Sequence, residues 1–252
     1  MCRDLKMANF NNILIIKEDA IFLADSHIKN GKGDLIDIFK KMLKKNEFPS
    51  QIFLLGDISN ILVGNLTSSV ESNNIMLSLL DSLSNKIEII YFEGNHDFNL
   101  ANVLPKVLKI SRKNQPLIAQ FKDKKVLLAH GDIFLNKKYE MYIKILTSSK
   151  SARILNFFDC LTKGRLYNFI SKKVENKQIK YPQNANHIIK KRLESYKLYI
   201  NSLNLEISMI IEGHFHIGKI VESESFIYVA LGSFYHDNSV FSILDNKFKK
   251  IF

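Results

Sequence analysis

The sequence predicts an α/β fold whose functional side chains lie at the carboxyl ends of its strands. Two observations lead to this prediction. Between residues 20 and 131, strand-like apolar runs alternate with helix-like ones, an order typical of βαβ units in layered α/β folds. In addition, five apolar runs end directly in polar residues, and α/β sheets present their chemistry at the carboxyl ends of their strands.

These five runs are short enough to be strands, and each leads into a different polar motif. The central run, 87–92, is followed by Glu93-Gly94-Asn95-His96-Asp97-Phe98. The runs at 21–24, 52–55, 126–129 and 209–211 lead, in that order, into Asp25-Ser26-His27, Gly56-Asp57, His130-Gly131-Asp132 and Gly213-His214-Phe215-His216. We expect the five strand ends to contribute to one site.

Helices and further strands complete the predicted fold. Apolar residues recur at intervals of three or four in 35–43 and 75–83, which predicts a helix in each segment. From residue 207 onward the pattern changes to short strands separated by turns, at 207–211, 226–231, 240–244 and 248–252. We therefore expect a mixed pair of sheets.

The segment from 134 to 206 differs from the rest of the chain. Helical spacing recurs in 139–146, 154–161 and 189–203, and Pro182 marks a break before the last of these helices. The segment holds 15 Lys or Arg against 5 Asp or Glu, which accounts for +10 of the formal net charge of +11. We predict that residues 134–206 form a basic, aromatic-rich helical cap inserted into a core made of residues 1–133 and 207–252.

The composition indicates a soluble globular protein. Apolar residues make up 46% of the chain, and no apolar run approaches the roughly 20 residues of a transmembrane helix. Residues 1–10 lack the apolar segment of a signal peptide. The two cysteines, Cys2 and Cys160, are too few for a disulfide framework. We therefore expect a cytoplasmic protein.

Oxygen ligands for metals are present at three of the strand ends. Asp25 and His27 are two residues apart just beyond a strand, where a turn can bring both onto one ion. Asp57 follows Gly56, and its carboxylate can bridge two cations because it has two oxygens. Asn95 supplies a neutral carbonyl oxygen. Two divalent cations about 3.5–4 Å apart can clamp the attacking and leaving oxygens of a phosphoryl displacement.

Imidazole nitrogens come from His130, His214 and His216. The last two are two residues apart and therefore point to the same side of an extended segment. Nitrogen and oxygen ligands without thiolate suit Mn²⁺, Zn²⁺ or Fe, and they argue against a structural zinc site of the thiolate type.

Each motif also has an ordinary explanation when taken alone. Asp-x-His after a strand is more often a turn with a surface histidine, and Gly-Asp is a common turn dipeptide. Five of the seven histidines nevertheless fall in these motifs, which favours a functional site. We interpret the other two, His187 and His236, as ordinary polar histidines.

The order of these motifs resembles that of the calcineurin-like metallophosphoesterases. Their pattern D-x-H, GD, GNH[DE], H and GHxH is matched from Asp25 to His216. The resemblance implies a four-layer αββα sandwich with two divalent metals at the sheet edge, Mn²⁺ being favoured and Zn²⁺ or Fe the alternatives. It implies that water acidified by the cations attacks phosphorus. The implied ligands are Asp25, His27, Asp57 and His216 for the first metal and Asp57, Asn95, His130 and His214 for the second.

The resemblance assigns His96 to catalysis and not to a metal. In the family, the matching histidine faces the scissile phosphate, where it stabilises developing charge or protonates the leaving oxygen. Asp97 is then expected to orient His96 or to support the metal site from behind. The alternative role for His96 is a structural hydrogen bond.

A narrower resemblance concerns the substrate. The segment 229–240 is similar to the closing strands of the bacterial UDP-2,3-diacylglucosamine hydrolases of lipid A synthesis, whose helical cap lies at the same point of the chain and accommodates acyl chains. The best-known of these enzymes have Arg in place of His96, whereas a divergent branch keeps His, and this chain resembles that branch. The resemblance implies cleavage of a lipid-linked nucleotide diphosphate to 2,3-diacylglucosamine 1-phosphate (lipid X) and UMP.

The basic cap is compatible with several kinds of binding partner. Apolar faces surrounded by lysines favour peripheral binding to an anionic inner-membrane surface, with about 1 kcal/mol for each basic residue near it. Alternatively, the apolar faces simply pack on the core. A nuclease or nucleotide phosphodiesterase, with the cap binding a polyphosphate backbone, is the second functional hypothesis. A non-catalytic scaffold is a third, which the complete ligand set disfavours. We expect neither an obligate protein partner nor nucleic acid.

Overall fold

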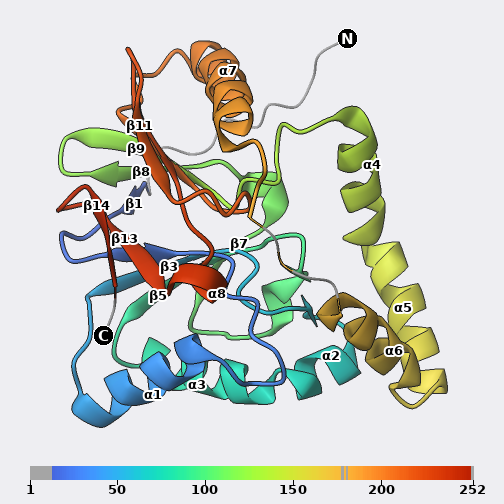
Figure 1. Cartoon of the computed structure of the whole chain (residues 1–252). Helices are drawn as coiled ribbons and strands as arrows, with labels where there is room; N and C mark the ends of the chain where they lie inside the picture. Colours follow the sequence, from blue (N-terminus) through green and yellow to red (C-terminus); the bar gives the residue numbers. More distant parts are fainter. Residues whose placement is uncertain (1–12, 177–178, 180, 251–252) are drawn as a thin grey trace.

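The computed structural model describes residues 13–250 apart from 177, 178 and 180. The predictions for the segment 1–10, for Cys2 and for the end of the strand 248–252 fall outside these residues. The described part of the chain forms two six-stranded sheets packed face to face, with helices on both outer faces (Figure 1). The expected four-layer αββα arrangement is confirmed. The predicted strands and helices are present, with ends that differ by up to a few residues.

The first sheet carries three of the five polar motifs. Its central strands β2 (Ile21–Leu23), β3 (Gln51–Leu55) and β5 (Glu88–Phe92) are parallel, and their apolar residues are buried because both faces of the sheet are covered. β13 (Ser239–Ser242) pairs antiparallel with β2, and β14 (Lys247–Lys250) forms the edge on that side. In spatial order the strands are β14 (Lys247–Lys250), β13 (Ser239–Ser242), β2 (Ile21–Leu23), β3 (Gln51–Leu55), β5 (Glu88–Phe92) and β7 (Leu108–Ile110).

The second sheet carries the other two motifs. β9 (Lys124–Ala129) and β10 (Met209–Glu212) are parallel and in register, with Ala129 opposite Glu212. The two histidine motifs that follow these residues therefore leave the sheet next to each other. In spatial order the strands are β1 (Leu14–Ile15), β8 (Leu117–Phe121), β9 (Lys124–Ala129), β10 (Met209–Glu212), β12 (Ile227–Ala230) and β11 (Lys219–Glu222).

Three apolar clusters hold the four layers together. Between the sheets, the rings of Phe22 and Phe53 stack with centroids 4.5 Å apart. The helices α1 (Asp34–Lys45) and α3 (Asn74–Ser84) cover the outer face of the first sheet, and α7 (Ala185–Leu203) covers the second. Burial of these faces supplies the main driving force for folding.

The predicted cap segment, 134–206, contains two kinds of helix. α7 belongs to the outer layer of the core, as its packing on the second sheet shows. The helices α4 (Lys137–Leu146), α5 (Ser149–Leu161) and α6 (Arg165–Glu175) instead run beside the layers (Figure 1). A small apolar cluster anchors them, in which Tyr167 of α6 packs with Val63, Leu66 and Phe98 of the core.

Several short elements connect the layers. Because each of them spans only a few residues, the sequence has too little periodicity to predict them. None of the helices in the described ranges is long and apolar enough to cross a membrane. The short elements are β4 (Leu62–Val63), which pairs with β6 (Asp97–Phe98), α2 (Thr67–Ser72), η2 (Leu100–Asn102), η3 (Arg112–Asn114) and α8 (Phe234–Asp237).

Candidate metal centre

The residues predicted as metal ligands lie together where β2, β3, β5, β9 and β10 end. Ligand atoms within 4.8 Å of one another define three overlapping groups: Asp25, His27 and His216; His27, Asp57 and His96; and Asp57, His130 and His214. Asn95 adjoins the last group, because its Oδ1 lies 3.3 Å from His130 Nε2. Asp57 is common to two groups, as a bridging carboxylate would be.

The backbone of these loops is strained at the predicted ligands. Asp25, His27, Asp57, His214 and His216 have φ angles between +43° and +68°, a region that side-chain-bearing residues adopt rarely and at a cost of about 1–3 kcal/mol each. Such strain persists where the surroundings impose it, and it is concentrated at functional sites.

Buried polar atoms without partners mark the first group. Asp25 is fully buried, and its Oδ2 accepts a hydrogen bond from the backbone N–H of His214 at 2.9 Å. Asp25 Oδ1 makes no hydrogen bond, although His216 Nε2 lies 3.2 Å away. Both ring nitrogens of His27 are also buried without a partner. Unpaired buried polar atoms are costly, and a divalent cation would satisfy Asp25 Oδ1 together with one of the two His27 ring nitrogens.

Asp57 lies between the two halves of the site. Its Oδ1 accepts a hydrogen bond from the backbone N–H of His96 at 2.8 Å, and its Oδ2 is 3.5 Å from His130 Nε2. His130 Nδ1 donates to the carbonyl of Leu55 at 2.8 Å, so its Nε2 is the nitrogen that faces the site. Gly94 is required here, because a Cβ at that position would lie 2.3 Å from Asp57 Oδ1.

The electrostatics favour binding of cations. Burial lowers the pKa of His27 and of His214 to about 4, so both are neutral at pH 7 and have a lone pair to offer. Burial opposes ionisation of Asp57, but His130 beside it holds the pKa of that carboxyl well below its usual value. Burial likewise disfavours a charged His130, but Asp57 raises the pKa of the imidazole. A metal ion would take the place of the His130 proton.

Asp97 supports the loop that carries Asp57. It is fully buried, and its carboxylate accepts hydrogen bonds from the backbone N–H groups of Asp57, Ile58 and Gly94 at 2.6–2.9 Å and from the Tyr91 hydroxyl at 2.6 Å. Burial and the neighbouring Asp57 raise the pKa of Asp97 to about 7. Of the two roles expected for Asp97, these contacts favour support of the site over orientation of His96.

His96 is oriented by a backbone carbonyl. Its Nδ1 donates to Asn60 O at 2.8 Å, which leaves Nε2 for the site. The imidazole is half-buried, and its ring centroid lies 5.1 Å from that of His27, edge to face. This geometry permits a contact between His96 Nε2 and a phosphate held by the other side chains.

Comparison with known proteins identifies the family. Residues 20–218 match the calcineurin-like phosphoesterase family, which is well over half of the chain. The chain belongs to this family. It is therefore a metal-dependent phosphoesterase, and the buried carboxylates and imidazoles described above provide donors of the type that its divalent cations require.

Relatives of this phosphoesterase include proteins named UDP-2,3-diacylglucosamine hydrolase. The protein from Coxiella burnetii is 22% identical over 228 residues, which cover 87% of this chain and 91% of that protein. The one from Haemophilus ducreyi is 20% identical over 230 residues, covering 90% and 96%. Others of the same name, such as that from Pseudomonas fluorescens, are matched over about half of their own length. Among solved structures, an archaeal phosphodiesterase aligns with 92% of this chain and 98% of its own, at 12% identity and a TM-score of 0.43.

His236 of the phosphoesterase lies nearer to the site than its sequence context indicates. Its ring centroid is 6.3 Å from that of His216, its ring stacks on Tyr181 at 4.4 Å, and its Nε2 is buried without a hydrogen-bond partner. The sequence interpretation as an ordinary polar histidine missed this proximity. It results from α8 folding back onto the end of β2, which no local pattern predicts. His187, in contrast, is exposed on α7.

Arg192 of α7 is a second feature that the sequence did not reveal. Its guanidinium is buried and forms two hydrogen bonds with Glu212, at 2.8 and 2.7 Å. A third hydrogen bond, of 2.6 Å, reaches the carbonyl of Ile133, and the guanidinium also lies 5.1 Å from the centre of the Tyr196 ring and 5.2 Å from that of Phe215. Arg192 thus ties together the two loops that carry His130, His214 and His216.

Proposed function

We propose that this phosphoesterase hydrolyses UDP-2,3-diacylglucosamine to 2,3-diacylglucosamine 1-phosphate (lipid X) and UMP at a dinuclear site. The observation that carries this proposal is the exposure of large apolar side chains on α4–α6, in a chain that also holds the candidate metal centre described above. These three helices expose Met141, Tyr142, Ile145, Ile154, Phe157, Phe158, Leu161 and Phe169, each by 47–68%. A diacylated substrate needs such a surface, whereas a purely polar phosphoester does not. The relatives named above support the same substrate.

In this proposal Asp25, His27, Asp57 and His216 would hold the first cation. Asp57, Asn95, His130 and His214 would hold the second, so Asp57 would contribute to both. When bound, Mn²⁺ or another divalent ion would supply positive charge for the phosphate and lower the pKa of a water molecule. The side chains of the site would position the phosphorus of the substrate. His96 Nε2 would stabilise charge on the phosphate oxygens or protonate the leaving oxygen, and Asp97 would keep the Asp57 loop in position.

The direct test is release of UMP from the diacylated UDP-sugar by the Mn²⁺-loaded protein in detergent, with single-stranded DNA as a parallel substrate. We expect UMP release that depends on added metal and little cleavage of DNA. Metal-loaded protein that leaves the lipid substrate intact would contradict the proposal.

A nucleotide phosphodiesterase or nuclease is the second candidate, and the basic residues between 134 and 206 favour it. Lys150, Arg153, Lys163 and Arg165 are exposed around the apolar surface of α5 and α6. Binding to a polyphosphate backbone would weaken steeply with salt, because each neutralised phosphate releases counterions. The lipid substrate would instead show weaker salt dependence together with sedimentation on vesicles.

We predict that the exposed apolar face of α5 mediates binding to anionic membranes. Replacing both Phe157 and Leu161 with Ser should weaken sedimentation with anionic vesicles at least about tenfold, since each large side chain that inserts contributes about 1.5–3 kcal/mol. Leu198→Ser is the matched control, because Leu198 is 74% exposed on α7, away from α4–α6. Equal loss of sedimentation in both variants would contradict an interface specific to α5.

We also predict that His96→Ala keeps both metals and loses rate. General acid–base catalysis contributes a factor of about 10²–10⁴ to the rate, so kcat should decrease by a factor in that range. Metal analysis by mass spectrometry should still find two equivalents of metal per protein. The variant His187→Ala, which removes an exposed histidine, is the control and should change neither kcat nor the metal content. If His96→Ala lost one equivalent of metal, His96 would be a ligand, which its distance to His27 and Asp57 allows.

A further inference from the structure

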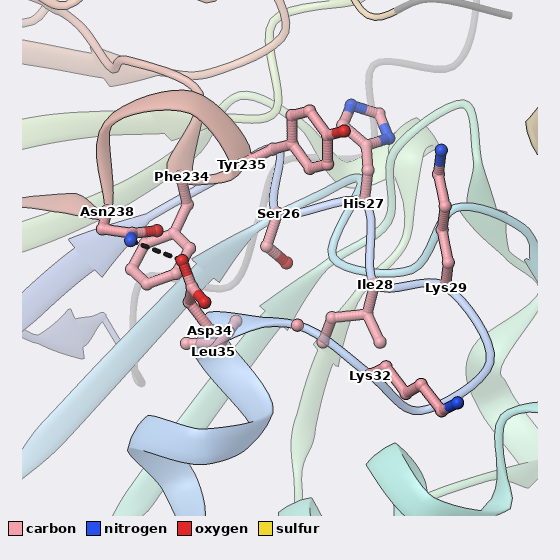
Figure 2. Close-up of a pocket in the computed structure, with 11 residues that line it drawn as sticks. Ser26, His27, Ile28, Lys29, Lys32, Asp34, Leu35, Phe234, Tyr235 and Asn238 are labelled. Atoms are coloured by element: carbon pink, nitrogen blue, oxygen red, sulfur yellow. Dashed lines mark hydrogen bonds between the residues drawn. The ribbon is translucent and has the colours of Figure 1, made fainter.

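A pocket opens directly beside His27, outside the ring of predicted ligands. It lies between the loop that follows β2, the beginning of α1 and the short helix α8 (Figure 2). Its cavity volume is about 190 Å³. His27 forms part of its wall and also belongs to two of the metal-binding groups. A substituent on a phosphate held at the metal centre can therefore extend into this pocket.

The wall formed by α8 is fixed relative to the metal centre. The backbone N–H groups of Phe234 and Tyr235 donate to the carbonyls of Ala24 and Asp25 at 3.0 and 3.1 Å. The Ser233 hydroxyl also donates to the carbonyl of Asp25, at 2.9 Å. These bonds attach the pocket wall to the strand end that carries the first ligand. The distance from the pocket to the reacting phosphorus is thus set by the fold.

The side chains of the pocket combine three kinds of chemistry. The Lys29 ammonium lies 5.8 Å from the centre of the Tyr235 ring, so a cation and an aromatic face are close together. At the other end, Asn238 Nδ2 donates to Asp34 Oδ2 at 2.6 Å (Figure 2). This pair leaves the Asn238 amide oxygen and the second Asp34 oxygen as acceptors. Lys32 adds a second positive charge to the lining.

Size and polarity decide which part of a lipid-linked nucleotide fits. The cavity is below the roughly 300–1,000 Å³ of sites that enclose drug-sized ligands, so two acyl chains and a sugar do not fit in it. Its lining combines apolar side chains, among them Ile28, Leu35 and Phe234, with two lysines, a carboxylate and an amide. A nucleoside, in contrast, offers a flat ring for Tyr235 and hydrogen-bond donors for Asp34 and Asn238, and its phosphate suits Lys29.

We infer that this pocket binds the nucleoside monophosphate part of the substrate, with the base or ribose against Tyr235 and the phosphate toward Lys29. The inference rests on the proposed function insofar as the substrate is a nucleotide ester. It assigns the two halves of the substrate to different surfaces: the polar half to the pocket between α1 and α8, the acyl half to the exposed apolar side chains of α4–α6.

Binding of UMP to the full-length, Mn²⁺-loaded protein tests the inference by isothermal titration calorimetry. Tyr235→Ala should raise the Kd for UMP about five- to 150-fold, the range that stacking of a base on an aromatic side chain supports. Tyr235→Phe should keep most of the affinity. Lys29→Ala should weaken UMP binding, whereas Lys44→Ala, on an exposed face of α1, should not. Inorganic phosphate should bind equally well to Tyr235→Ala and to the wild type.

The outcomes separate this inference from the proposed function. If UMP binds Tyr235→Ala as tightly as the wild type, or if the variant loses phosphate in the same proportion as UMP, the pocket assignment is overturned even when the lipid substrate is hydrolysed. If the lipid substrate is not hydrolysed but Tyr235→Ala selectively loses UMP, the pocket assignment stands and the proposed substrate falls.

Discussion

Replacing Asp57 with Ala is expected to abolish tight binding of both metals and to lower kcat by at least about three orders of magnitude. The side chain belongs to two of the three metal-binding groups, and one of its oxygens lies 3.5 Å from His130 Nε2. Its loss therefore weakens both halves of the site. Divalent metals contribute several kcal/mol of charge stabilisation to phosphoryl transfer, and about 1.4 kcal/mol corresponds to a factor of ten in rate.

Metal analysis and steady-state kinetics on Asp57→Ala check this expectation together. Asp37→Ala is the matched control, because Asp37 is an exposed carboxylate on α1 with a side-chain exposure of 68%. It should retain two equivalents of metal and full activity. Asp57→Ala that still holds two metals would show that Asp57 is not the bridging ligand. Thermal unfolding of the metal-free variants separates loss of ligands from loss of fold.

The position of the site could be predicted because it follows from strand topology. Parallel strands end at one edge of a sheet, so motifs after β2, β3 and β5 must lie near one another, and the same holds for β9 and β10. Short-range spacing then selected the candidate ligands at these ends, and their metal-binding roles stay a prediction. The sequence could not show that α8 returns to β2 and places Tyr235 and His236 beside His27 and His216, because this contact joins residues about 200 positions apart.

Helical spacing alone did not distinguish covered from exposed apolar faces. The stripe on α7, with Ile189 and Tyr196, packs against the second sheet, whereas the stripe on α5, with Ile154, Phe157 and Leu161, is exposed. Both stripes have the same periodicity, because the spacing of apolar residues indicates a helix but does not indicate what packs against its apolar face. Only the tertiary structure shows that α7 packs on the core and that α5 has an exposed apolar face.

The sequence also could not show whether a charged side chain such as Arg192 is exposed or buried. In the sequence it follows Lys190 and Lys191 and contributes to the positive charge of the segment 134–206. The structure buries it opposite Glu212, so it cannot contribute to a basic membrane-binding surface. Glu212 also accepts hydrogen bonds from Tyr196 and Tyr228, at 2.7 and 2.5 Å. Each nitrogen of the Arg192 guanidinium and each oxygen of Glu212 thus has a hydrogen-bond partner, as buried charges require.

Arg192→Met is expected to lower the free energy of unfolding by about 3–5 kcal/mol. Met keeps the aliphatic part of the side chain but leaves Glu212 as a buried carboxylate without its cation, and breaking a buried ion pair by removing one partner carries a penalty of this size. Urea unfolding of the variant measures the change. Lys191→Met is the control, because Lys191 is exposed in the next position of the same helix and should change stability by less than about 0.5 kcal/mol.

The double variant Arg192→Met/Glu212→Gln tests whether the uncompensated charge is the cause. Gln is neutral and keeps an acceptor oxygen for one of the two tyrosines, while its NH₂ group can donate to the hydroxyl oxygen of the other, so most of the lost stability should return. The hydrogen bond from Arg192 to Ile133 O is not restored in the double variant. Since that bond positions the loop after His130, metal affinity should stay below that of the wild type even after stability has recovered. A double variant as unstable as Arg192→Met would instead mean that the packing of Arg192 on Phe215 and Tyr196, and not its charge, stabilises this end of the sheet.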